Sequence, residues 1–509
     1  MEFYVDSAKV PSTIYSPFKK VCVTRQVVQE LTLPDYCADI GRVIDARARV
    51  WVEECIASED TKLEVRAKAS FCILYLSDKD EELHKYCFDC DADARGELRC
   101  DKEAVITSID IHSKDPIVRL SGTRKLTVRL DCEYRVFLLE KSEYNIPERS
   151  DGLEFLEKEE TVMNHVLLST RPEKLSEDIL LPESAPKIAE IICCDVNCTE
   201  PVTEFGDGNL TVTCDAEFSF IYNCENGGVN QFKTTLPITR LIEDPIVPNN
   251  AKLLSEVRIW DIKFGVGIDG SGENRVISLD FGVNANINAY YNDSLSYVAD
   301  AYSTLGECEI KTQNDGFSRL YSTYRGSEDI SHSIDGGSEE IEKILSLRCF
   351  PEIRHKRKEN GRLFLDGECT SVIFAKCGVG GYATYEYRIP FEHSMELPES
   401  VSDAEISVKA IRSACEGSGD SYKLRIRLGF ESVLTESGDF SSVCHAKSMV
   451  SEETENADAH ALLIYYPDSE ETLWSVAKEH RVARDKLCEL NSLEGDALSG
   501  KKFILIPKN

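Results

Sequence analysis

Long stretches of this chain alternate apolar and polar side chains, and that alternation predicts β-strands rather than helices. The run from Leu63 to Tyr75 has an apolar residue at every odd position, and the run from Leu210 to Tyr222 has one at every even position. Period-two patterning of this length is typical of antiparallel strands with one buried and one solvated face. Further runs of the same kind lie at 126–136, 277–287, 363–374 and 424–430.

The strand-like runs belong to a unit that the chain uses three times. The first copy begins with an anchor, 33–44, in which Leu-Pro is followed by an apolar triplet. The anchor at 181–192 repeats this spacing 148 residues later, and the third, 341–345, keeps only the triplet. So long a period indicates duplicated domains rather than a solenoid of small repeats. Because the triplet has apolar residues at i, i+3 and i+4, each anchor is predicted to contain one short helical turn.

Each unit also contains a predicted hairpin, with turns at 58–61, 206–209 and 358–361. The second and third turns contain Asp-Gly and Asn-Gly, which tolerate the positive φ of tight hairpins. The basic run Arg354–Lys358 leads into the third turn. It is predicted to be a solvated hairpin tip or, alternatively, a contact with an acidic surface in self-association.

Together these patterns predict a mainly β protein with three consecutive sandwich-like or barrel-like repeat domains and a small C-terminal βααβ domain. Charged or Ser/Glu-rich joints are expected near 148–160, 312–340 and 451–458. The predicted organisation is an N-terminal extension (1–29), β domains at 30–150, 178–312 and 335–450, an acidic linker (451–459) and the small domain (460–509).

The small domain consists of two apolar runs, 462–466 and 500–507, that enclose helical patterns at 471–478 and 486–493. Thr472-Leu-Trp-Ser-Val-Ala begins the first helix and Leu-Asn ends the second, and this arrangement resembles the LysM domain family. The resemblance implies a binding module without catalytic activity. Its predicted core comprises Leu473, Val476, Ala477, Leu487 and Leu490, with Leu463, Tyr465, Phe503 and Leu505 or their neighbours from the strands.

In LysM domains the sugar groove lies between the loop that enters the first helix and the loop that leaves the second, here 468–472 and 491–500. The family commonly has Gly-Asp where this chain has Glu470-Glu471, and Pro-Gly-Gln where it has Ser499-Gly-Lys501. Loss of the glycine removes a permissive backbone position from the groove, which favours protein recognition over N-acetylglucosamine. An aromatic side chain among neutralised charges is a common protein-binding anchor. The predicted binding surface is therefore Thr472, Trp474, Lys478, Asn491 and Leu493.

The three anchored β units, the acidic joint and the single terminal LysM-like domain together resemble the SPOCS (DUF3794) family, as combined in SipL-type spore coat morphogenetic proteins of clostridia. The resemblance covers nearly the whole chain. It implies a non-catalytic scaffold of the mother-cell cytoplasm that is recruited to the forespore surface. The implied partner is the coat-basement ATPase SpoIVA, bound through the LysM-like domain. The alternative is a peptidoglycan-binding protein of the cell or spore envelope.

Composition narrows the possible partners and the compartment. The formal charge of −32 argues against nucleic acid or an anionic membrane as the main partner. No apolar run approaches the roughly 18 residues of a membrane span, and the N-terminus lacks a signal-peptide pattern, so a cytoplasmic protein without membrane insertion is expected. The 20 cysteines are scattered singly through strand-like runs, which favours reduced thiols over a disulfide framework.

Three motifs could carry chemistry, and each has a simpler explanation. Gly265, Gly267 and Gly270 match a dinucleotide loop, but a strand rather than a helix follows, so a hairpin turn is predicted. Cys87-Phe-Asp-Cys90 is one C-x-x-C without the second pair that zinc usually needs. The nine histidines form no His-x-x-x-His pair. We therefore expect no enzymatic activity, no metal and no cofactor.

Overall fold

The computed structural model describes most of the chain from Ser12 to Pro507 and is mainly β, with two short helices near the C-terminus. The predicted linker 451–459 lies outside the described residues. The residues left out are 1–11, 17, 59–61, 78, 80–81, 100–102, 145, 207, 244, 336–340, 379–380, 419–420, 451–461, 469–470, 494, 497, 499–501 and 508–509.

Nine strands form the first β body, in which two antiparallel sheets enclose a hydrophobic core. One sheet is built on β9, which pairs with β1, β2, β7 and β8, and the other is built on β4, which pairs with β3, β5 and β6. The strands are β1 (Ser12–Tyr15), β2 (Lys19–Thr32), β3 (Arg42–Ser58), β4 (Lys62–Leu76), β5 (Leu83–Asp91), β6 (Ala94–Glu97), β7 (Glu103–Ser113), β8 (Ile117–Leu120) and β9 (Lys125–Tyr144).

The second body has the same arrangement, with sheets built on β17 and β14 around a second core. β17 pairs with β10, β11 and β16, and β14 pairs with β12, β13 and β15. The strands are β10 (Leu153–Ser169), β11 (Glu173–Leu180), β12 (Ile188–Cys198), β13 (Val202–Phe205), β14 (Asn209–Cys224), β15 (Val229–Glu243), β16 (Lys252–Gly267) and β17 (Val276–Ser303).

The third body encloses its core with two three-stranded sheets, β18-β23-β22 and β19-β20-β21. The strands are β18 (Gly306–Asp335), β19 (Ile341–Glu359), β20 (Arg362–Cys377), β21 (Gly381–Glu396), β22 (Asp403–Ser418) and β23 (Ser421–Val450). The turn between β19 and β20 confirms the predicted hairpin, because Asn360 and Gly361 have φ of 50° and 72°.

The predicted helical turns are wrong: the apolar triplets lie in strands β3, β12 and β19, except that Ile40 precedes β3 by two residues. The pairing register shifts by one residue at Ile44, Ile192 and Leu345, which are equivalent positions of the three anchors. A β-bulge inserts one residue and so changes which face the following side chains occupy. The i, i+3, i+4 spacing therefore comes from bulged strands and not from helical periodicity.

Two of the predicted joints are also strands. Residues 153–160 belong to β10, and 312–335 belong to β18. The predicted N-terminal extension contains β1 and β2, which pair with β9 and so complete the first body. Strands with charged outer faces are locally as polar as linkers, so composition alone predicts joints in these segments.

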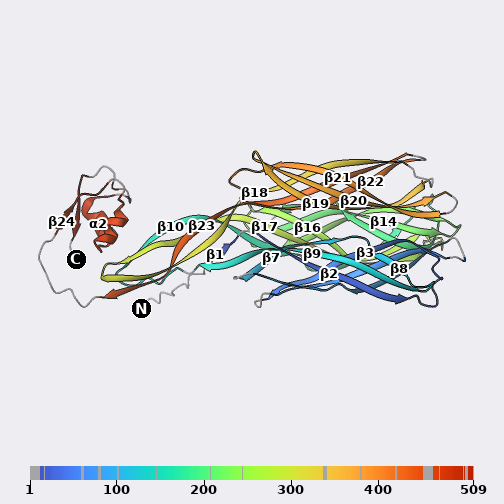
Figure 1. Ribbon diagram of the computed structural model, residues 1–509, viewed down its shortest axis with the longest axis horizontal. Helices are drawn as coiled ribbons and strands as arrows, with labels where there is room; N and C mark the ends of the chain where they lie inside the picture. Colours follow the sequence, from blue (N-terminus) through green and yellow to red (C-terminus); the bar gives the residue numbers. More distant parts are fainter. Residues whose placement is uncertain are drawn as a thin grey trace.

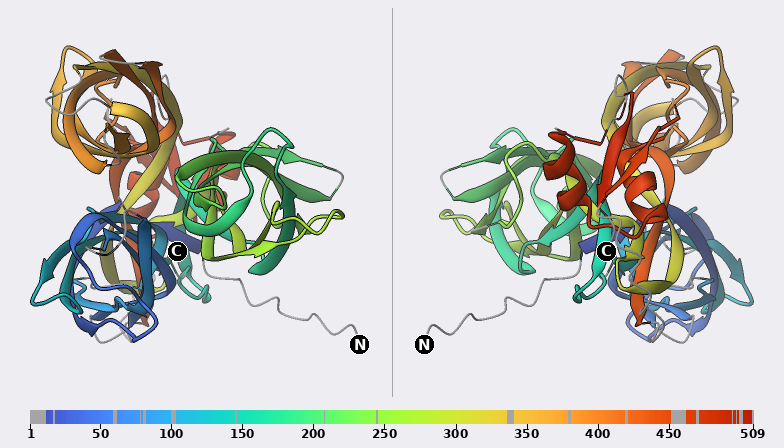
Figure 2. Two further views of the ribbon diagram at one scale, coloured as in Figure 1. Left: turned by 90° about the vertical axis from the view of Figure 1, so that its right-hand side faces the viewer. Right: turned by 90° about the vertical axis from the view of Figure 1, so that its left-hand side faces the viewer.

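The three bodies surround a common axis, as three lobes seen end-on in Figure 2. On this axis lies a separate apolar cluster to which all three bodies contribute equivalent residues, among them Leu74, Ile221 and Phe374. Burial of these apolar side chains away from water favours packing of the three bodies against one another.

Strands β10, β17, β18 and β23 extend beyond the bodies as a stalk (Figure 1). Its interior is apolar and again mixes the bodies, with Tyr144, Leu295 and Phe440 in one cluster. The last elements lie at the end of this stalk: β24 (Leu462–Tyr465), α1 (Leu473–Glu479), α2 (Arg484–Asn491) and β25 (Ile504–Pro507). Neither helix in the described part of the chain could span a membrane.

Candidate functional site

The C-terminal module, residues 462–507 as far as they are described, has the predicted strand-helix-helix-strand order. β24 and β25 pair antiparallel, and the helices cover one face of this two-stranded sheet. Four of the five predicted helical core residues are fully buried, but Leu490 is 40% exposed. From the strands, the core receives Tyr465 and the neighbouring positions Ile504 and Ile506, whereas Leu463 and Phe503 are 48% and 50% exposed.

Three of the five predicted binding residues have structural roles inside the module. Thr472 caps α1: its hydroxyl accepts from Ser475 N at 3.1 Å. Asn491 Nδ2 donates to the carbonyl oxygen of Leu505 at 2.7 Å, and Leu505 N donates back to Asn491 Oδ1 at 2.6 Å. Leu493 packs against the module core. These side chains maintain the fold that the module needs before it can bind anything.

The other two predicted residues, Trp474 and Lys478, face the stalk. Trp474 Nε1 donates to Asp300 Oδ2 of β17 at 2.9 Å, and Lys478 Nζ lies 2.7 and 2.6 Å from the two oxygens of the same carboxylate. These contacts lower the pKa of Asp300 although burial raises it. Trp474 is only 6% exposed.

Tyr302 completes this contact two residues further along β17. Its ring meets Trp474 edge-on at a centroid distance of 4.9 Å, and its hydroxyl donates to the carbonyl oxygen of Val482 at 2.7 Å. The surface predicted for an external partner is therefore partly covered by the protein's own stalk. The sequence offered no signal for Asp300 or Tyr302, which lie in a long strand among many similar residues.

The outer face of the β24–β25 sheet remains exposed and is apolar. Leu462, Ile464 and Tyr466 point to this face from the first strand and are 48%, 55% and 71% exposed. Phe503 lies beside them, with its ring centroid 6.4 Å from that of Tyr466. A contiguous apolar patch on an otherwise strongly acidic protein marks a binding surface better than any single exposed side chain.

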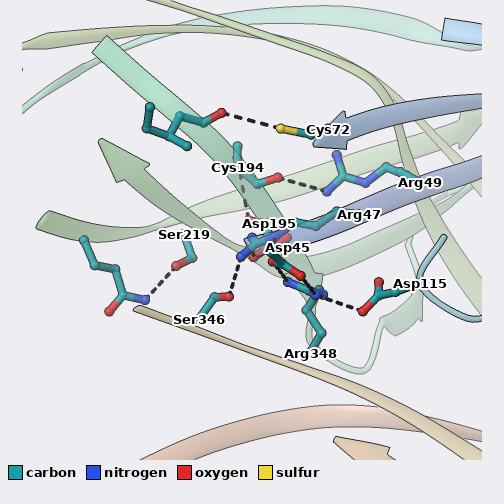
Figure 3. Close-up of polar contacts among 12 residues, drawn as sticks. Asp45, Arg47, Arg49, Cys72, Asp115, Cys194, Asp195, Ser219, Ser346 and Arg348 are labelled. Carbon is teal, nitrogen blue, oxygen red and sulfur yellow. Dashed lines mark hydrogen bonds and ion pairs between the residues drawn. The ribbon is translucent and has the colours of Figure 1, made fainter. Parts of the chain in front are cut away.

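A second polar site lies on the axis between the bodies (Figure 3). Arg47, Asp195 and Arg348 occupy equivalent positions of β3, β12 and β19, three residues after each bulge. Arg47 Nη1 donates to Asp195 at 2.7 Å and Arg47 Nη2 to Ser346 at 2.8 Å, so one side chain joins all three bodies.

Asp45 holds the two arginines of this cluster together. Arg47 Nε lies 2.7 Å from one of its oxygens, and Arg348 makes two contacts of 3.0 and 2.9 Å. Burial raises the pKa of Asp45, but the two guanidinium groups outweigh it and lower the pKa from 3.8 to about 2. Arg348 also binds Asp115 at 2.8 Å. Two buried arginines thus have three carboxylate partners, which makes the centre a structural ion cluster.

Beside this cluster is a cavity of about 660 Å³ lined by all three bodies. Such a volume would suit a small ligand. Its lining mixes charges of both signs with thiols, and the charged side chains that converge there, Arg47, Asp195 and Arg348, belong to the ion cluster. The lining includes Arg49, Lys85, Cys72, Cys87, Cys193, Cys194, Asp195, Phe264, Arg348 and Cys415. Among the described residues, no group of three or more His, Cys, Asp or Glu side chains is arranged to hold a metal ion.

The remaining motifs have the local structures expected of them. The glycines 265–270 end β16 and form the hairpin turn into β17, as predicted. In the basic run, Arg354 pairs with Glu368 at 3.0 Å, and Lys358 Nζ donates to the carbonyl oxygen of Val401 at 3.1 Å. These contacts agree with a hairpin end that is neutralised within its own body.

No family model, curated protein or solved structure matches this chain. The likeness to SPOCS and LysM domains therefore remains a prediction from its sequence motifs.

Proposed function

We propose that this protein is a non-catalytic scaffold of spore coat assembly, whose C-terminal module docks on a coat-basement ATPase of the SpoIVA type at the forespore surface. In this proposal the three β bodies are SPOCS domains and the module is a LysM domain. The cellular role and the identity of the partner rest on the family resemblance.

One observation supports docking through the module: the apolar outer face of its sheet is exposed at the end of the molecule. Ile464 and Tyr466 expose more than half of their surface there. Burial of such side chains contributes about 25 cal/mol per Å² removed from water. This face replaces Trp474 and Lys478 as the proposed docking surface, since those two side chains already contact the stalk.

The experiment is a binding assay between the full-length chain and the purified ATPase. Ile464→Asp is expected to weaken binding at least tenfold, because it places a charge in the centre of the apolar face. Val202→Asp is the matched control. Like Ile464, Val202 is a β-branched apolar residue in a strand, and it is 53% exposed, but it lies on the second body. Unchanged binding of the Ile464 variant would refute this surface.

A chain that ends at Val450 tests the module as a whole. This truncated chain is expected to fold but no longer to bind the ATPase. If this truncation still copurified with the ATPase at the level of the full chain, docking through the module would be wrong. Sedimentation of the full chain with purified peptidoglycan, reversed by soluble chitin oligomers, would instead favour the glycan-binding alternative.

A further inference from the structure

Two cysteines from neighbouring strands lie together in the lining of the central cavity. Cys72 of β4 and Cys87 of β5 are directly opposed in the antiparallel register. Opposed side chains have Cβ atoms about 4.5–5.5 Å apart. A disulfide needs about 3.5–4.5 Å. A small approach of the two strands is therefore enough to join the sulfurs.

Cys87 is the accessible member of the pair. It is one of the exposed cysteines, whereas Cys72 is partly buried between the bodies. The neighbouring Cys72 thiol lowers the pKa of Cys87; burial opposes this, and the positive charge of Lys85, two residues earlier on the same face, lowers the pKa further. An exposed thiol with a lowered pKa is the more reactive member of such a pair toward disulfides.

We propose that Cys72 and Cys87 form a redox-active dithiol, which a low-molecular-weight disulfide of the glutathione class oxidises to a cross-strand disulfide. This inference is independent of the docking function proposed above. It uses only the geometry of the first body and its contact with the second.

The reaction is two thiol–disulfide exchanges. The Cys87 thiolate attacks one sulfur of the small disulfide RSSR, the S–S bond breaks, and RS⁻ leaves while Cys87 carries a mixed disulfide. Cys72 loses its proton to solvent and attacks the Cys87 sulfur, which displaces the second RS⁻. Two protein thiols are oxidised, and RSSR is reduced to two RSH after both thiolates take up protons.

Oxidation would act on the contact between two bodies. In the reduced protein Cys72 Sγ donates to the carbonyl oxygen of Ile192 in β12 at 3.7 Å. The disulfide has no S–H proton and cannot make this hydrogen bond. Ile192 lies at the bulge of β12, in the apolar cluster on the axis. Oxidation of the dithiol would therefore weaken a contact between the first and second bodies at the axis.

In the part of the chain that the structure describes, the other exposed cysteines lack an opposed thiol. Cys22 pairs with Arg135 on β9. Cys444 has no directly opposed residue on β18, because the register between β18 and β23 shifts by one residue there. Two further pairs of thiols are close enough to shift each other's pKa, Cys198 with Cys214 and Cys349 with Cys369. In each of these pairs one partner is buried in a body core and the other is only partly exposed, so neither pair offers a thiol as accessible as Cys87.

The test is to incubate the folded full-length chain with oxidised glutathione, block the remaining thiols and map the peptides by mass spectrometry. We expect one cross-link, between the peptides of Cys72 and Cys87. Cys72→Ser should stop the reaction at a stable glutathione adduct on Cys87, and Cys87→Ser should abolish the cross-link. Cys349→Ser, which removes a thiol from a buried pair, should react like the wild type.

Two results would overturn the proposal. One is a glutathione adduct on Cys87 that persists in the wild type without forming the cross-link. The other is an unreactive Cys87 in a sample whose Cys22 has reacted. Phenylarsine oxide gives a second readout on the unmodified chain, because it bridges neighbouring thiols. One bound equivalent that blocks the cross-link is expected, and cross-linking at an undiminished rate would contradict the proposal.

Discussion

Replacement of Asp300 by alanine should release the C-terminal module from the stalk. In the docked state Asp300 accepts from Trp474 Nε1 and pairs with Lys478. Without this carboxylate the buried indole N–H has no acceptor, which costs about 1–3 kcal/mol. The ion pair adds at most about 1 kcal/mol, since the Lys478 side chain is 42% exposed. The docking equilibrium should therefore weaken by about 1–4 kcal/mol, or about 5- to 900-fold.

Quenching of Trp474 fluorescence by acrylamide measures this release. The chain has three tryptophans, so the experiment uses a background in which Trp51 and Trp260 are replaced by phenylalanine. Trp474 is 6% exposed when docked and loses the cover of Tyr302 when the module separates. The quenching constant should rise in Asp300→Ala.

Asp293→Ala is the matched control, because Asp293 also lies on β17 but contacts Asn164 rather than the module. Its quenching constant should equal that of the parent. An unchanged constant in Asp300→Ala, with the module helices still folded, would refute the docking contact. Binding of the ATPase should survive Asp300→Ala, because the outer sheet face is not part of this contact.

Three further predictions concern stability. Arg348→Ala removes one of the two guanidinium groups bound to buried Asp45 and the guanidinium bound to Asp115, and it should cost about 3–5 kcal/mol of unfolding free energy. Arg354→Ala, which breaks a pair with a 47% exposed arginine, should cost less than about 1 kcal/mol in the same denaturant titration; equal losses would contradict the central cluster. Burial lowers the pKa of His165 from 6.5 to about 4, so the unfolded chain binds a proton at a higher pH than the folded protein does. The free energy of unfolding should therefore fall by about 3 kcal/mol as the pH drops from 6.5 to 4. His165→Gln should lack this loss when thermal unfolding is measured across the same pH range. Gly361→Ala should lower the unfolding midpoint, since φ of 72° costs a residue with a Cβ about 1 kcal/mol or more, whereas Gly122→Ala, without a positive φ and with open space around it, should not.

The strands of the β bodies could be predicted because a half-buried strand has an apolar residue at every second position of the sequence. Leu63–Tyr75 lies within β4, and Leu210–Tyr222 lies within β14. The Asn360-Gly361 turn was predictable for a similar local reason, since few residues accept a positive φ. The bulges at Ile44 and its equivalents were not predictable, because a single inserted residue imitates helical spacing over so short a segment.

The candidate site was less predictable, since it depends on which surfaces meet. The sequence predicts Trp474 as an anchor for an external protein, whereas in the structure its ring contacts Tyr302 of the same chain. It also paired Cys87 with Cys90 by spacing. In a strand, residues three apart point to opposite faces, and the thiol that meets Cys87 is Cys72, across the hairpin.

The sequence alone therefore determined the mainly β class, the threefold use of one pattern, and the two short helices of the C-terminal module. All of these depend on interactions between residues close in the chain. Only the tertiary structure decided that Arg47, Asp195 and Arg348 meet on one axis and that the module rests on Asp300. The physical reason is that an alternating pattern specifies which face of a strand is buried, but not which other surface buries it.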